Sequence, residues 1–67
     1  MVGFDHEKLK RLRKENHLTQ EQLAEMAEIS DRYLRAMESN RAVPSCTVLF
    51  QISRALNTTM DDLMRIK

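Results

Sequence analysis

Residues 18–44, LTQEQLAEMAEISDRYLRAMESNRAVP, decide the fold because they contain two helix start signals only eleven residues apart. The first signal is a capping box made by Thr19 and Gln22. The threonine hydroxyl can accept from an amide of the first turn, and the glutamine side chain can reach back to the amide of Thr19. The sequence therefore predicts a helix that starts near Gln20, with an apolar stripe formed by Leu23, Met26 and Ala27.

A second helix follows this one after a very short turn. Ser30 can cap it, and Leu34 and Met37 give it a buried stripe. Only Glu28 and Ile29 remain for the turn, so the two helices must fold sharply against each other. This arrangement presents the second helix outward, as in the helix-turn-helix units that read DNA.

Start signals also predict three further helices. Asp5 can cap a first helix over about residues 6–16, and Ser45 can cap a fourth that ends near Asn57. A second capping box, Thr59 with Asp62, predicts a short fifth helix that carries Met60, Leu63, Met64 and Ile66. The fold class expected is all-α: a compact five-helix bundle in which residues 1–67 form one domain.

The net charge gives little indication of a binding partner, but the distribution of charged residues along the sequence is more informative. The net charge is +1, from 11 Lys and Arg against 10 Asp and Glu. Basic residues gather within residues 8–14 and 32–41, whereas Glu21, Glu25 and Glu28 share one predicted helix. We expect one basic and one acidic face; for residues 8–14 an ordinary solvated helix surface is the alternative.

Composition excludes several classes of protein. The lone Cys46 excludes an internal disulfide and a cysteine-based zinc site, fits the reducing cytoplasm, and is expected to be a small core residue. No apolar run is long enough for a membrane span. No nucleophile triad, carboxylate pair, glycine-rich loop or histidine pair with ligand spacing is present. We therefore expect a cytoplasmic protein that is not an enzyme and has no metal, cofactor or small-molecule ligand.

Taken together and in order, these residues resemble the Cro and lambda-repressor type of helix-turn-helix regulator, the XRE family. The similarity covers about residues 6–64. It depends on the motifs that follow: Leu9, Leu12 and Arg13; Leu18-Thr19-Gln20; Leu23-Ala24; Ile29-Ser30; Met37-Glu38; Pro44-Ser45; Ala55-Leu56; and Thr59 with Leu63. The resemblance implies a lambda-repressor-like domain with the helix-turn-helix at its second and third helices.

The resemblance also implies which residues meet DNA. Base edges in the major groove would be read by Asp31, Arg32, Arg35 and Ala36. Phosphates would be bound by Thr19, Gln20, Tyr33, Ser39, Asn40 and Arg41. Arginine suits the O6 and N7 acceptors of guanine, although Arg32 or Arg35 could instead meet a phosphate. Asp31 could accept from a cytosine amino group or stabilise the helix start, and Tyr33 could be a packing residue.

The resemblance also implies three structural features. Arg13 and Glu38 match a partly buried ion pair, and Gln20 matches a residue that braces the start of the recognition helix. Glu28 and Asn40 stand where the family often has glycine, which implies a left-handed backbone at both positions.

The function expected is sequence-specific binding of double-stranded DNA by a transcriptional regulator, most often a repressor in this family. A single module contacts few base pairs, so we expect a homodimer on a two-fold symmetric operator. Met60, Met64 and Ile66 are the predicted dimer interface, with Val48 and Phe50 as further candidates. The alternative is a protein-protein adaptor, such as an antitoxin or an antirepressor, on the same helical scaffold.

Overall fold

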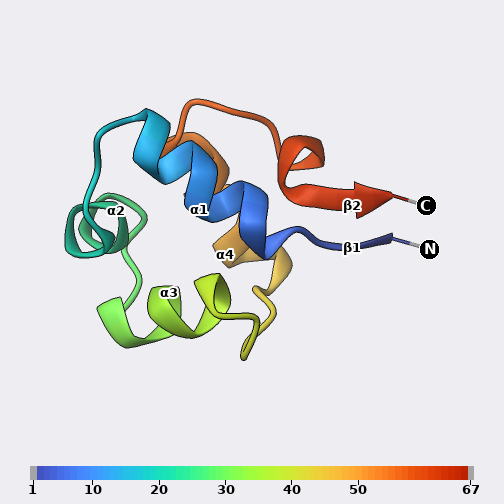
Figure 1. The fold of residues 1–67 in the computed structure, drawn as a ribbon, viewed down its shortest axis with the longest axis horizontal. Helices are drawn as coiled ribbons and strands as arrows, with labels where there is room; N and C mark the ends of the chain where they lie inside the picture. The colour runs from blue at the N-terminus through green and yellow to red at the C-terminus, as the bar shows by residue number, and fades with distance from the viewer. Residues whose placement is uncertain (1, 67) are drawn as a thin grey trace.

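Four α-helices and a two-stranded sheet make up residues 2–66, the part of the chain that the computed structural model describes; side chains are described from residue 3 to residue 64. The elements are β1 (Val2–Phe4), α1 (His6–Glu15), α2 (Gln20–Met26), α3 (Asp31–Glu38), α4 (Cys46–Ala55), the single 3-10 turn η1 (Asp61–Leu63) and β2 (Met64–Ile66). Figure 1 shows β1 and β2 side by side at one end of the molecule and α2 at the other.

The predicted start of each of the first four helices is confirmed. Asp5, Thr19, Ser30 and Ser45 each accept a hydrogen bond from the backbone amide three residues further on. At Thr19 the capping box is complete, because Gln22 Oε1 also accepts from the amide of Thr19 at 2.8 Å. Local hydrogen bonding thus sets where these helices begin.

All four α-helices also end in the same way. The residue beyond each cap has a positive φ: 58° at His17, 59° at Glu28, 63° at Asn40 and 55° at Asn57. In each case the next amide donates to the carbonyl five residues back, as Ile29 does to Ala24 at 2.9 Å. The left-handed conformation implied for Glu28 and Asn40 is therefore present, and neither residue is glycine.

Relieving this conformation at Glu28 is expected to stabilise the domain. Glu28 is exposed, so a Glu28→Gly variant loses no packing and removes the strain on Cβ. The gain, after the added freedom of the unfolded chain, is about 0.5–1 kcal/mol, or about 2–8 °C in Tm. Thermal unfolding followed by circular dichroism measures it. The matched variant Asn57→Gly should gain less because asparagine tolerates this conformation better; an equal or larger gain there would contradict the explanation.

The core lies where the four helices meet. α3 packs against α1 and α2, and α2 also packs against α4. The fully buried side chains contributed by these helices and by η1 are Leu9, Leu23, Leu34, Met37, Ile52 and Leu63. Ala24 is buried and Ile29 packs against the core at the turn between α2 and α3, where the short connection brings the two helices together.

The prediction of a fifth helix is wrong. Thr59 and Asp62 do form the reciprocal hydrogen bonds of a capping box, but only one 3-10 turn follows them. The chain then becomes the strand β2, which pairs antiparallel with β1 in the register Phe4↔Met64 and Val2↔Ile66. Pairing with the distant residues 2–4 replaces the helix because a helix this short has little stability of its own. The described fold is therefore four helices with a small sheet.

Asp62 makes the start of η1 sensitive to acid. Hydrogen bonds from the Thr58 hydroxyl, and then from Thr59, hold the pKa of Asp62 below its ordinary value of 3.8. A lowered pKa adds stability above pH 3.8, and this contribution is lost as the pH falls through the lower folded value.

We therefore expect Asp62→Asn to unfold less steeply with acid than the wild type between about pH 4 and pH 2. Acid titration of urea midpoints measures the difference. The neighbouring exposed Asp61 is the matched control, since Asp61→Asn removes an equal charge; parallel acid curves for the two variants would exclude the proposed role of Asp62.

The expected burial of Cys46 is also wrong. Its thiol is exposed, because Cys46 is the first residue of α4 and the buried stripe of that helix begins a turn later, at Leu49. Within residues 2–66, no helix is long and apolar enough to cross a membrane.

Candidate nucleic-acid interface

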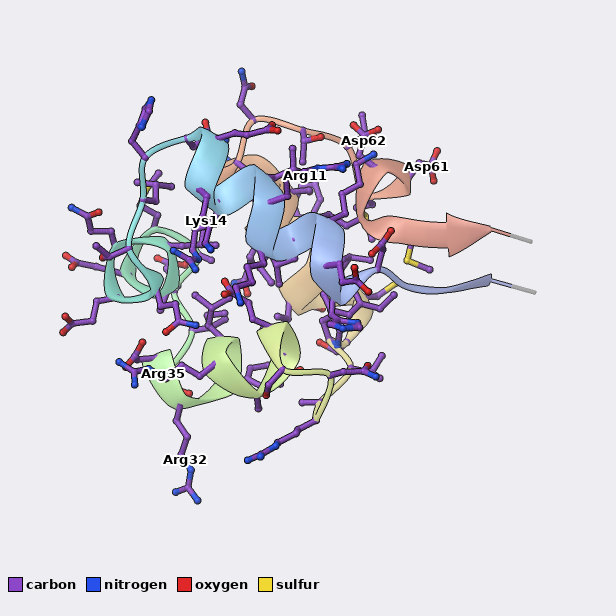
Figure 2. The ribbon with its side chains drawn as sticks, in the orientation of Figure 1. Arg11, Lys14, Arg32, Arg35, Asp61 and Asp62 are labelled. Carbon is purple, nitrogen blue, oxygen red and sulfur yellow. The ribbon has the colours of Figure 1, made fainter. Side chains whose placement is uncertain are left out.

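One face of helix α3 is buried against the rest of the domain, and the opposite face is exposed. Leu34, Met37 and Glu38 are buried against the rest of the domain. Arg32 and Arg35 are exposed on the other side, and Figure 2 shows both extending from α3 away from α1, in different directions. The Ser30 cap and the turn at Glu28 fix where this helix starts, so the same local signals fix which residues point outward.

An open hollow of about 590 Å³ runs along the outer face of α3. Its lining consists of Asp31, Arg32, Arg35, Ala36, Ser39 and Arg41. The structure thus brings together all four residues predicted to read bases and two of those predicted to bind phosphate. Three of the six carry a guanidinium group, which can form paired hydrogen bonds to guanine or phosphate.

Asp31 and Arg35 form an ion pair within this surface. Arg35 Nε lies 3.0 Å from Asp31 Oδ2, one helical turn away, and the Arg35 side chain remains 61% exposed. The second carboxylate oxygen, Asp31 Oδ1, is buried and has no hydrogen-bond partner among the described residues. Arg35 therefore has a preferred position before any ligand binds.

The segment after α3 supplies a basic edge to the surface. Asn40 is exposed in its left-handed conformation, and the amide of Arg41 donates to the carbonyl of Ala36 at 2.8 Å. The Arg41 side chain is exposed. These contacts hold the Arg41 backbone at the end of α3 while its guanidinium extends outward.

Two hydroxyls predicted to bind phosphate donate within the chain instead. The Tyr33 hydroxyl donates to the carbonyl of Val43 at 3.2 Å and so ties α3 to the loop before α4. The Ser39 hydroxyl donates to the carbonyls of Arg35 and Ala36. Each hydroxyl has one hydrogen, so neither can donate to a phosphate without giving up an internal bond.

A buried network of hydrogen bonds joins the end of α3 to α1 and α2. Arg13 Nε and Nη2 lie 2.7 Å and 3.0 Å from the two carboxylate oxygens of Glu38, and Arg13 Nη1 donates to the carbonyl of Leu18. Arg13 and Glu38 are only 8% and 7% exposed. Gln20 Nε2 donates to Glu38 Oε1 at 3.1 Å. Gln20 therefore braces the end of α3, whereas it had been expected to brace the start of this helix. One carboxylate thereby joins α1, α2 and α3.

Exposed charge is mixed on α1, where Glu7 and Glu15 accompany the basic residues, and acidic on α2. Lys10, Arg11 and Lys14 lie on the outer side of α1, where Figure 2 shows Arg11 and Lys14, and with His6 they line a second hollow that reaches Glu38. α2 carries exposed glutamates at positions 21 and 25, with a third at position 28 just after it. Among the described residues, no group of three or more His, Cys, Asp and Glu could hold a metal ion.

The contacts of the site that were not predicted from the sequence include these three: Asp31 with Arg35, Gln20 with Glu38, and Tyr33 with Val43. Only the first has a local signal, since an acidic residue four positions before an arginine is a favourable pair on a helix. The other two join residues far apart in sequence, for which spacing gives no indication.

Comparison with known proteins shows what this arrangement is similar to. The family model described as Helix-turn-helix matches residues 9–63. The HTH-type transcriptional activator BcrR of Enterococcus faecalis is 39% identical over 59 residues, which are 88% of this chain and 29% of BcrR. The chain thus spans less than a third of that relative's length.

Two solved structures share the fold. The biofilm master regulator SinR, in a complex with DNA, has a TM-score of 0.83 and 30% identity, covering 87% of this chain and 94% of SinR. The P22 c2 repressor, in a complex with a synthetic operator, has a TM-score of 0.83 and 26% identity, covering 87% and 88%.

Proposed function

Because the chain belongs to the XRE-type helix-turn-helix family of DNA-binding transcriptional regulators, we propose that it binds a specific operator in double-stranded DNA and represses transcription there. The observation that carries this proposal is the outer face of α3, where Arg32, Arg35 and Arg41 line one open surface. SinR and the P22 c2 repressor, which share the fold, were solved with DNA.

In the proposed complex α3 lies in the major groove. Arg32 and Arg35 would donate to base edges, with Asp31 and Ala36 beside them on the same face. Phosphates would be bound by the side chains of Asn40 and Arg41 and by the Thr19 hydroxyl, which accepts from Gln22 and keeps its own hydrogen. Gln20 would use the second hydrogen of the amide that already bonds to Glu38.

The test is selection of binding sites from random duplex DNA by the purified chain, followed by anisotropy titration of the selected site at several salt concentrations. We expect a two-fold symmetric consensus and a log-log salt slope of about −0.9 for each phosphate neutralised. The double variant Arg32→Ala, Arg35→Ala changes only exposed side chains and serves as the folded control. If the folded wild type enriches no sequence, the proposal fails and the protein-binding adaptor becomes the better reading.

We also propose that the protein acts as a homodimer. Met60 and Met64, predicted at the interface, lie half-buried and pack against the core, and the side chain of Ile66 lies outside the described residues. Phe50 on α4 is 49% exposed. We retain Met60 and Met64 as proposed contacts, and of the two further candidates we favour Phe50, since large exposed apolar side chains favour association and Val48 packs against the core.

A Phe50→Lys variant is expected to sediment as a monomer of 7.9 kDa, whereas the wild type is expected to sediment at about twice that mass at the same concentration. The reason is that a lysine charge would have to be buried in the interface. Thr47→Lys places the same charge on an exposed polar position of α4 and is the matched control. Unchanged mass for Phe50→Lys would remove this residue from the interface.

A further inference from the structure

The Asp31 carboxylate lies in the first turn of α3, and its side chain is 37% exposed. Oδ1 is buried and unpartnered, and Oδ2 lies 3.0 Å from Arg35 Nε. The amide of Tyr33 is already capped by Ser30 Oγ, so the side chain of Asp31 is not needed as the helix cap. What Asp31 contacts in this structure is Arg35.

The contact limits where the Arg35 guanidinium lies. Helical side chains lean toward the N-terminus of their helix, and the pair holds the Arg35 guanidinium near the first turn of α3, the part that reads bases in helix-turn-helix proteins. Because Nε faces the carboxylate, both terminal nitrogens remain available. Two parallel donors match the O6 and N7 acceptors of guanine.

Arg32 provides the internal comparison. It is exposed on the same surface, but the ion pairs of the described residues do not include it. Its long side chain therefore has to be ordered when it binds, whereas the position of Arg35 is partly fixed beforehand.

We propose that Asp31 is a positioning residue that fixes Arg35 for end-on recognition of a guanine, and that it does not itself read a base. This inference rests on the proposed DNA-binding function. It also accounts for an acidic group on a surface that would face phosphates. The repulsion lowers affinity for all DNA, while the fixed guanidinium increases the preference for one base pair.

The test compares Asp31→Asn, Arg35→Ala and the double variant with the wild type, by site selection and by competition with operators changed at single base pairs. We expect Asp31→Asn to reduce the guanine preference about two- to five-fold, the range expected for an exposed ion pair. The loss should fall at the same base pair that Arg35→Ala affects. Affinity for unrelated duplex DNA should stay equal or rise.

Two further comparisons distinguish a positioning role of Asp31 from a general structural effect: the coupling between the Asp31 and Arg35 substitutions, and rescue by the conservative variant Asp31→Glu. Asp31→Asn should have no effect at that base pair once Arg35 is alanine, whereas it should add to Arg32→Ala at another base pair. Asp31→Glu keeps a carboxylate four residues before Arg35 and should restore most of the preference. In the free protein, Asp31→Asn should shift the NMR resonance of the Arg35 Nε proton, whereas Asp31→Glu should leave it close to that of the wild type, because the carboxylate lies 3.0 Å from Nε.

Four results would overturn this inference and leave the proposed function in place. Asp31→Asn could remove a cytosine preference at a different base pair, which would mean direct reading by Asp31. It could change affinity equally on all sequences, or the Nε proton could be unaffected, which would mean that the pair does not position Arg35. If the wild type selects an operator but Arg35→Ala keeps its full base preference, this inference fails alone; if the wild type selects no operator, the proposed function fails with it.

Discussion

Glu38→Ala is expected to cost about 3–5 kcal/mol of folding free energy, the range measured when one partner of a buried ion pair is removed. The substitution leaves the Arg13 guanidinium, 8% exposed, without its carboxylate, and it removes the acceptor of Gln20 as well. A domain of this size has only about 5 kcal/mol of stability to lose. Urea denaturation followed by circular dichroism should therefore find the variant largely unfolded at room temperature.

The control for this prediction replaces both charges together. Arg13→Met with Glu38→Leu fills the same space with apolar side chains, and such exchanges are often neutral or stabilising. We expect the double variant to be far more stable than Glu38→Ala. A cost below about 1 kcal/mol for Glu38→Ala would instead indicate that water replaces the lost carboxylate.

Arg35→Ala is expected to lose about 1–3 kcal/mol of discrimination at one base pair of the operator, or about 5- to 150-fold in preference. Binding to unrelated DNA should weaken by a smaller factor, because the variant loses one positive charge and leaves the Asp31 carboxylate unpaired near the phosphates. Competition titrations with single-base operator variants measure both quantities.

Arg41→Ala is the contrasting variant. Arg41 follows α3 and is proposed to bind phosphate, so its loss should weaken binding to every sequence alike and reduce the salt slope by about 0.9. If Arg35→Ala behaved in this uniform way, Arg35 would be a phosphate ligand and not a base reader.

Most of the fold could be predicted because its signals are local. Asp5, Thr19, Ser30 and Ser45 each bond to an amide only three residues away, so each signal lies within a few residues of sequence. The positive φ of Glu28 and Asn40 also follows from the geometry of one helix end.

The C-terminal segment could not be predicted on the same basis. Thr59 and Asp62 form the expected capping contacts, yet the backbone of residues 64–66 pairs with residues 2–4. An alternating pattern was present, since Met64 and Ile66 are apolar, as are Val2 and Phe4. Segments this short fit either period, and only the distant pairing partner decides between them.

The site was predictable as a surface but not as a set of contacts. The outward positions of α3 follow from its helical period and from the buried stripe on its other side. Which groups bond to each other there depends on side-chain conformations, as the internal bonds of Tyr33 and Ser39 show.

The two faces of α3 also bear on how binding preference could be reprogrammed. The side chains that hold the helix in place, Leu34, Met37 and Glu38, are buried, whereas Arg32 and Arg35 are exposed and serve no packing role. Changes on separated faces usually add in free energy. The exposed residues of α3 can therefore be replaced together, with Asp31 and Arg35 treated as one unit. Such variants of the domain should bind new operators with little loss of folding free energy.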